Sequence, residues 1–197
     1  MYFNMNKIFS LTISMTFLIS CTKNEMNEKI EVNKILNTIL KYESKRNSFR
    51  ANHKFLINPE FQKLKIYVPS QKEILGEEPG PPPFFNKNII HLLDLKGSKF
   101  KNRKSDSLNL LKQNVYIFDS LNIDAEINSN IQIANKQEID KRKKLYQFSN
   151  PVYFNENFVY IETIYYDSVF GIGFGYLLEK QKDGSWIIKE ITNTFIT

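Results

Sequence analysis

The last fifty residues contain four runs rich in β-branched and aromatic residues, namely 152–154, 158–166, 172–180 and 186–194. Short polar segments separate these runs, and Asp183-Gly184 lies between the last two. Asp-Gly between two such runs is a strong hairpin signal, because a type I′ turn needs positive φ at both central positions. The sequence therefore predicts a C-terminal antiparallel meander with a type I′ turn at Asp183-Gly184.

Glycine occupies three alternate positions where the third run begins, at Gly171, Gly173 and Gly175, which we call the glycine stripe. Successive side chains of a strand point to opposite faces, so the glycines share one face and Phe174 belongs to the other, the expected core face. A two-residue turn at 167–168 would place part of the preceding run beside the glycines, with the residues Tyr160, Glu162 and Ile164.

This glycine stripe has two interpretations. It could floor a shallow ligand groove walled by Tyr160, Glu162 and Tyr166. Alternatively, close packing or an aromatic side chain covers the glycines, and we favour this second interpretation.

Trp186 is the only tryptophan of the chain. A two-residue turn at Asp183-Gly184 places it opposite Gln181, on the face of the glycine stripe. We expect its indole to be buried, because large aromatic side chains are highly buried on average.

Helical spacing of apolar residues predicts an amphipathic helix over 28–47, with the stripe Val32, Ile35, Leu36, Ile39 and Leu40. We expect a strand at 62–68, a stiff proline-rich connector at 77–85, and a helix at 107–114 after the N-cap signal Ser105-Asp106-Ser107. Residues 89–95 fit a short helix or a buried strand, and 122–140 remain ambiguous. The expected fold class is α+β, with N-terminal amphipathic helices packed on a C-terminal antiparallel β-meander in a single domain, 28–197.

The N-terminus has a basic residue, Lys7, followed by the apolar run 8–18. This pattern is typical of a secretory signal peptide, and the run is too short for a permanent membrane span. Its end, Leu18-Ile19-Ser20-Cys21, resembles the lipobox of bacterial lipoproteins, in which the cysteine is acylated. The resemblance implies a signal peptide at 1–20, a lipidated Cys21 and a tether at 21–27. It also implies anchoring to the outer membrane, on its periplasmic or surface side, or to the cell membrane.

The net charge of +6 is modest, with basic clusters at 96–104 and 141–144. No nucleic-acid recognition motif surrounds either cluster, so we expect no nucleic-acid partner. We favour solvated turns or helix faces, and attraction to an anionic membrane or polysaccharide is the functional alternative.

The sequence shows no catalytic, cofactor or metal-binding motif. His53 and His91 are the only histidines, and Cys21, the only cysteine, is assigned to lipid. No Gly-x-Ser-x-Gly nucleophile elbow occurs, and the glycine stripe lies inside a strand rather than in a nucleotide loop. We therefore expect non-catalytic binding or scaffolding with an envelope protein or polysaccharide. A hydrolase with a carboxylate or His91 in a pocket is the alternative.

The lipobox, the proline segment, Asp106-Ser107-Leu108 and the C-terminal fifty residues together resemble a group of uncharacterised lipoproteins of the Bacteroidota. Members of that group have cysteines near the glycine stretch, whereas 167–175 contains none. The hairpin Leu177-Leu178-Glu179-Lys180 to Asp183-Gly184-Ser185-Trp186 also resembles the last strands of cystatin-like α+β folds such as nuclear transport factor 2. That second resemblance implies an architecture and no active site.

Overall fold

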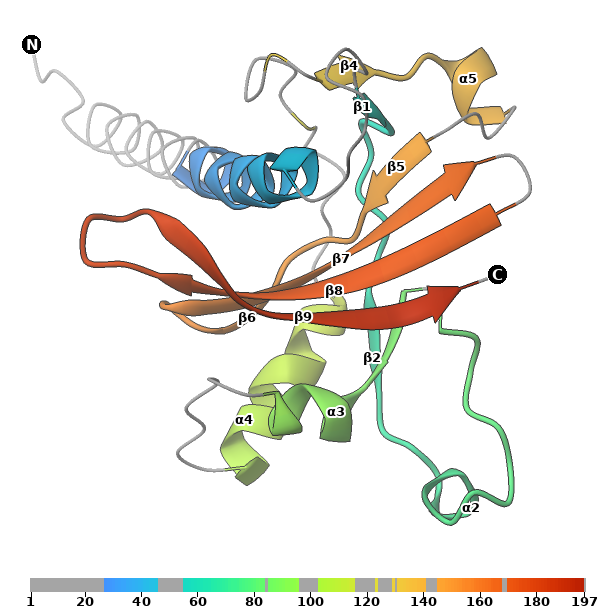
Figure 1. Cartoon of the computed structure of the whole chain (residues 1–197). Coiled ribbons are helices and arrows are strands. Elements are labelled where there is room, and N and C mark those ends of the chain that lie inside the picture. The colour runs from blue at the N-terminus through green and yellow to red at the C-terminus, as the bar shows by residue number, and fades with distance from the viewer. Residues whose placement is uncertain are drawn as a thin grey trace, which may run out of the picture.

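A computed structural model describes residues 27–45, 55–83, 85–95, 103–115, 123, 129, 131–140, 145–167 and 170–196. The predicted signal peptide, Cys21, His53 and the cluster at 141–144 lie outside the described residues. The fold is mixed α/β, with a large, mostly antiparallel sheet and a few helices (Figure 1).

The main sheet has seven strands in the order β4-β1-β5-β7-β8-β9, with β6 also paired to β7. Their bounds are β1 Phe55–Ile57, β4 Ile131–Ile133, β5 Leu145–Phe148, β6 Val152–Asn155, β7 Phe158–Asp167, β8 Phe170–Lys180 and β9 Trp186–Ile196. Strand β1 runs parallel to β4 and β5, whereas β5 to β9 pair in antiparallel fashion. The predicted C-terminal meander is confirmed.

Residues 27–45 form a long helix that crosses one face of the sheet (Figure 1). All five residues of the predicted apolar stripe are buried and share a core with Phe174, Tyr176 and Trp186. Burial of each such side chain contributes about 1.5–3 kcal/mol. Two glutamates fix the helix on the sheet, since Trp186 Nε1 donates to Glu31 Oε1 at 3.0 Å and the Tyr176 hydroxyl donates to Glu43. The predicted helix is confirmed over 28–45, whereas 46–47 lie outside the described residues, and it already includes Asn27, which the sequence assigned to the tether.

Shorter elements cover the opposite face of the sheet. They are β2 (Lys65–Tyr67), β3 (Asn86–Asn88), α3 (Ile89–Asp94), α4 (Arg103–Lys112) and the 3₁₀ helix η1 (Gln113–Val115). Their apolar side chains form a second core with strands β6 and β7, made of Leu64, Ile66, Ile89, Leu92, Leu110, Val152 and Tyr160. The sheet is therefore covered on both faces, as Figure 1 shows.

The expected elements of this half are present with different bounds. The strand at 62–68 is limited to β2, which pairs with β3 in a separate two-stranded parallel sheet. The ambiguous patch 89–95 is the helix α3. Helix α4 begins at Arg103, so the Ser105 signal is inside the helix, where the Ser107 hydroxyl donates to the Arg103 carbonyl at 2.6 Å instead of capping.

Two short helices with side-chain caps lie where the sequence predicted no element: α5 is within the ambiguous segment 122–140, and α2 lies between the predicted strand 62–68 and the connector 77–85. In α5 (Lys136–Asp140), Asn135 Oδ1 accepts from the Glu138 amide at 3.0 Å and Glu138 Oε2 accepts from the Asn135 amide at 2.8 Å. This reciprocal pair follows the capping-box pattern. In α2 (Gln71–Ile74), the Ser70 hydroxyl accepts from the Glu73 amide at 3.1 Å.

The loop between β8 and β9 differs from the predicted type I′ turn. Only Gly184 has a positive φ there, at 79°, and Asp183 does not. The Gly184 amide donates to the Gln181 carbonyl and the Gln181 amide to the Ser185 carbonyl. This pattern fits a three-residue loop built on a type I turn, with glycine in the left-handed region. Asp183 Oδ1 stabilises it by accepting from the Ser185 amide at 2.9 Å and from the Ser185 hydroxyl at 2.7 Å.

The extra loop residue moves Trp186 to the other face of the sheet. Trp186 pairs with Lys180 rather than standing opposite Gln181, and its indole lies with Phe174 against the helix 27–45. The predicted face was therefore wrong, because side-chain direction reverses with a one-residue shift in register. The predicted burial is confirmed, since 5% of Trp186 is exposed.

The turn between β7 and β8 is also displaced. Asp167 pairs with Phe170, so it ends the strand rather than forming part of a turn at 167–168. Glu162 pairs with Gly175 and Ile164 with Gly173, whereas the predicted turn would have paired Glu162 with Gly173. The predicted side chains still flank the glycine stripe, since a shift of two positions preserves the face.

Candidate functional site

The glycine stripe is covered by neighbouring side chains. A Cβ added to Gly175 would lie 2.0 Å from the Tyr160 hydroxyl oxygen, and one on Gly173 would lie 2.3 Å from Thr194 Oγ1. Gly171 is buried as well. The open, glycine-floored groove is therefore not present at Gly173 and Gly175, because Tyr160 and residues of β9 fill that space. The absence of a side chain at Gly175 leaves the space that the Tyr160 ring occupies.

Two of the predicted groove residues instead meet in a buried polar cluster. The Tyr160 hydroxyl donates to Glu162 Oε1 at 2.8 Å, and Lys87 Nζ lies 3.4 Å from the same oxygen. The Lys87 ammonium also lies 5.0 Å from the centroid of the Tyr160 ring. The Glu162 side chain is 1% exposed and that of Lys87 14%. Tyr166, the third predicted wall residue, is half-buried farther along β7.

Burial controls the protonation of this Tyr160–Glu162–Lys87 cluster. Desolvation raises the pKa of Glu162, and the Lys87 charge and the Tyr160 hydrogen bond oppose that rise. Desolvation and the neighbouring Glu162 charge raise the pKa of Tyr160 well above its usual value. The tyrosine therefore remains a protonated donor and is no nucleophile. The cluster links β3 to the main sheet, and its Tyr160 and Glu162 side chains are buried.

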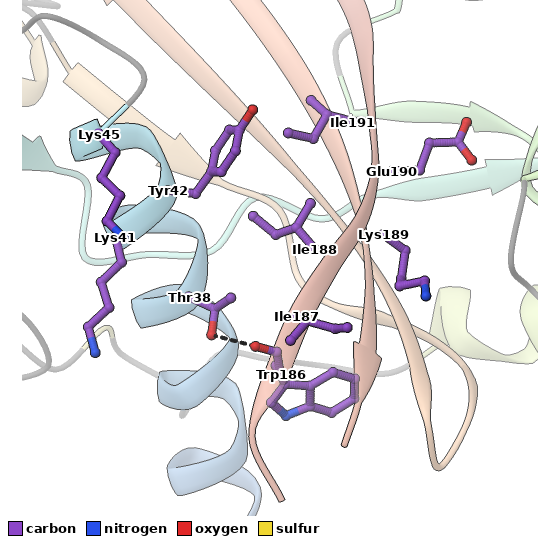
Figure 2. Close-up of a pocket in the computed structure, with 10 residues that line it drawn as sticks. All are labelled: Thr38, Lys41, Tyr42, Lys45, Trp186, Ile187, Ile188, Lys189, Glu190 and Ile191. Atoms are coloured by element: carbon purple, nitrogen blue, oxygen red, sulfur yellow. Dashed lines mark hydrogen bonds between the residues drawn. The ribbon is translucent and has the colours of Figure 1, made fainter. Parts of the chain in front are cut away.

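The structure does contain an open groove, between the helix 27–45 and the edge strand β9. Its volume is about 430 Å³, within the range of roughly 300–1,000 Å³ typical of ligand pockets. Figure 2 shows Tyr42, Ile188 and Ile191 directed into the space between helix and strand. At one end the Thr38 hydroxyl donates to the Trp186 carbonyl at 3.4 Å and brings the helix against β9. We call this site the helix–β9 groove.

The helix–β9 groove is apolar between the helix and the strand, and its charged side chains lie around the outside. Tyr42 is 36% exposed and Ile187 40% exposed, whereas Trp186 is 5% exposed. Three lysines and one glutamate also line it, namely Lys41, Lys45, Lys189 and Glu190. In Figure 2 the two helix lysines extend from the outer side of the helix, whereas Lys189 and Glu190 leave β9 on the side away from it. Lys189 Nζ also pairs with Glu179 Oε2 at 3.0 Å, so the charged side chains at this site are directed away from the space between helix and strand.

Sequence reasoning missed this groove and Lys87. The groove needs the helix 27–45 beside β9, two segments about 150 residues apart, as the Thr38 contact to Trp186 shows. Lys87 lies in a short strand that no pattern in the sequence indicated. No local signal marks either contact, since both arise from packing.

The remaining candidates for catalysis or metal binding do not come together. Among the described residues, no three His, Cys, Asp or Glu side chains form a group that could hold a metal ion. His91 is exposed on α3, and Glu77 and Glu78 are exposed after α2. Glu138 is engaged in the cap of α5. Asp124 and Glu126 lie outside the described residues.

We found no match to this chain among protein families, curated proteins or solved structures. Within the described ranges, the structure has no helix with both the length and the apolar character needed to cross a bilayer.

Proposed function

We propose that this chain is a lipid-anchored protein of the cell envelope that binds or scaffolds another molecule and does not act as a catalyst. The observation that carries the binding role is the open helix–β9 groove, into which Tyr42, Ile188 and Ile191 are directed. The lipobox-like ending at Cys21 supports the anchor and the export. A protein or polysaccharide of the envelope is the proposed partner.

The contrast between the groove and the polar cluster supports binding over catalysis. Glu162 and Tyr160 are buried, so a substrate cannot reach them without opening the second core. The groove is accessible, but the titratable groups on its rim are mainly lysines on an exposed helix face. The apolar side chains directed into the groove favour a ligand with apolar groups.

The source and finer architecture are part of the same proposal. We place the chain with the lipoproteins of the Bacteroidota that it resembles, and its fold with the cystatin-like architecture of nuclear transport factor 2. A long helix packed across an antiparallel meander supports that architecture.

Replacement of Cys21 tests the anchor. We expect Cys21→Ala to abolish both palmitate labelling and sedimentation with membranes, because the acyl chains alone attach the domain to lipid. Thr22→Ala, which leaves the acylated position intact, should behave as wild type. If the wild type takes up no label and the Cys21 variant still sediments with membranes, the anchor is rejected.

A pair of matched substitutions tests the groove. Ile187→Asp places a charge at the groove, and Leu108→Asp places one at a comparably exposed aliphatic on α4, where 53% of Leu108 is accessible. The Ile187 variant should no longer retain envelope components that the wild type retains, and the Leu108 variant should retain them. Equal retention by both variants contradicts a binding role for the groove.

The second candidate function is an envelope hydrolase that uses Glu162. The raised pKa of this carboxyl and its contact with Lys87 favour it, because perturbed groups often occur in active sites. The chain is then expected to hydrolyse an ester, amide or glycoside probe. Glu162→Gln should abolish turnover while the melting temperature stays near that of wild type. Absence of turnover in wild type rejects this candidate.

A further inference from the structure

The helix–β9 groove lies along the outer edge of β9. Strand β9 is the last strand in the order of the main sheet, and among the described strands only β8 pairs with it. Six consecutive residues of β9, 186–191, line the groove. Because successive side chains of a strand point to opposite faces, a groove that touches consecutive residues lies against the backbone edge of the strand. The groove is therefore placed where the backbone of a further strand would lie.

Trp186 is the first residue of β9 whose backbone faces outward. It pairs with Lys180, whose amide donates to the Asn157 carbonyl at 2.8 Å on the other side of β8. In an antiparallel ladder such a pair exchanges no hydrogen bonds, so the Trp186 N–H and C=O point away from β8. The Thr38 hydroxyl agrees with this direction, since it donates to the Trp186 carbonyl at 3.4 Å from the helix. The helix therefore already occupies this end of the edge.

Two more outward positions follow inside the groove. Leu178 and Tyr176 come at alternate positions after Lys180 in β8, so they too direct their backbone groups away from β9. Their partners Ile188 and Ile191 therefore direct N–H and C=O outward. Both isoleucine side chains are directed into the groove, as Figure 2 shows. Among the described residues, no hydrogen bond from outside the sheet reaches the backbone of either isoleucine.

These backbone groups and side chains fit an extended peptide. The backbone of another strand completes a row of outward N–H and C=O groups, and apolar pockets beside that row accept alternate side chains. Tyr42 on the helix and the two isoleucines supply the apolar contacts. We propose that the helix–β9 groove binds an extended segment of a partner protein, which adds to β9 as a further strand and places alternate apolar side chains against Tyr42.

The proposal rests on the proposed binding role of the groove and narrows its partner to a protein. A polysaccharide has no regular row of backbone amides and no apolar side chains at alternate positions. Of the two proposed kinds of envelope partner, the protein is therefore the one that this edge fits.

A second copy of β9 fits the edge poorly. Lys189 is the extra residue of a bulge, because Leu178 pairs with Ile188 and the next β8 residue, Leu177, pairs with Glu190. Bulges and lysines on an edge strand hinder the pairing of long regular strands. We therefore expect the partner segment to be short and to come from a different protein.

Amide hydrogen exchange of the free chain tests the direction of the edge groups. The amides of Ile188 and Ile191 should exchange faster than that of Thr192, which pairs with Gly175 and faces β8. We expect a difference of at least about tenfold, measured by NMR on the full chain in detergent micelles. Equal protection at the three positions means that this edge is already covered, and it overturns the proposal.

An extended peptide probe tests strand addition. The probe is an acetylated and amidated heptapeptide in which threonine and valine alternate. Its counterpart has the same side chains, with every backbone amide N-methylated. The first peptide should slow exchange at Ile188 and Ile191 and leave Thr192 unchanged. The methylated peptide should bind at least about fivefold more weakly, the effect of losing about two backbone hydrogen bonds.

A matched pair of substitutions tests the same hydrogen bonds from the protein side. Ile188→Pro removes one outward N–H and breaks no hydrogen bond to β8, because Ile188 and Leu178 exchange none. Ile188→Val keeps the N–H, with a side chain of similar size to proline. The proline variant should bind the probe at least about threefold more weakly than the valine variant. Melting temperatures show whether both variants fold, and if the proline variant unfolds, the methylated peptide decides alone.

Three results of the binding experiments overturn strand addition. They are equal binding of the two peptides, equal binding of the probe by the two folded Ile188 variants, and unchanged exchange at Ile188 and Ile191 when the probe is added. If envelope components are still retained through Ile187, the groove binds them without a strand and its proposed role stands. Protection that rises with protein concentration in the absence of probe identifies a second copy as the occupant and rejects the partner segment.

Discussion

Trp186 connects the helix 27–45 to the sheet through its ring and its Nε1 donor. The side chain is 5% exposed and donates to Glu31, which also pairs with Lys180. Truncation of a large buried aromatic side chain leaves a cavity as well as lost burial.

We expect Trp186→Ala to lower the free energy of unfolding by about 3–5 kcal/mol, measured by urea denaturation. The wild-type emission should be blue-shifted and poorly quenched by iodide. Red-shifted, readily quenched emission together with an unchanged unfolding midpoint in the alanine variant contradicts the core role.

Glu162 makes the stability of the fold depend on pH. Its carboxyl is buried beside Lys87 and Tyr160, and desolvation raises its pKa above the ordinary value of 4.5. A carboxyl whose folded pKa is raised binds its proton more tightly in the folded state. Its contribution to stability is therefore fully present below the unfolded pKa and is lost as pH rises through the folded pKa.

The stability of wild type relative to Glu162→Gln should therefore fall as the pH is raised from about 4.5 through the raised pKa of Glu162. Free energies of unfolding for both proteins across this range give the measurement. Glu156→Gln, in the exposed turn between β6 and β7, serves as the control and should keep the wild-type profile. If Glu162→Gln has the same pH profile as wild type, the Glu162 carboxyl does not cause the pH dependence of the free energy of unfolding.

At the scale of elements, the hairpin of β8 and β9 requires glycine at two positions for two different physical reasons. Gly175 lies in the middle of the strand, and the Tyr160 ring occupies the space that its side chain would need. Gly184 lies in the following loop with φ at 79° and nothing within 4 Å of an added Cβ. The first position is limited by packing and the second by backbone conformation.

Alanine at the two glycines should separate these effects. Gly175→Ala must displace a buried tyrosine, and we expect a cost of about 1–3 kcal/mol together with loosened packing around Tyr160. Gly184→Ala should cost about 1–2 kcal/mol through the left-handed backbone alone. Hydrogen exchange of β7 amides provides the distinction, since it should rise in the first variant only. Equal protection in both variants contradicts the packing explanation.

At the scale of the whole molecule, the two cores share β7. Val159 and Ile161 pack toward the helix 27–45, whereas Tyr160 between them packs toward α3 and α4. Neither core can lose its cover without exposing one face of the same strand. The sequence prediction of one folded unit over 28–197 follows from the need to cover such a sheet on both faces.

Limited proteolysis should therefore remove only residues before the helix and cut within 76–84. Thermal unfolding should show a single transition, because the two cores depend on the same sheet. Recovery of two fragments that each unfold cooperatively would contradict a single unit.

The sequence by itself determined the features that depend on local periodicity. The helix with its stripe from Val32 to Leu40 and the strands of the meander follow from spacings of 3.6 and 2, because each spacing brings apolar side chains to one face. Tyr160 and Glu162 were correctly placed beside the glycine stripe for the same reason.

Only the tertiary structure decided the register of the C-terminal hairpin, the side chains that cover the glycine stripe and the position of the helix–β9 groove. One extra residue in the loop before Trp186 reversed the face of its indole, and the type of turn depends on the whole hairpin rather than on Asp183-Gly184 alone. Lys87 contacts Glu162, and the helix 27–45 contacts β9, although each pair is far apart in the sequence. Such contacts come from the packing of complete elements, for which the periodicity of a single segment carries no information.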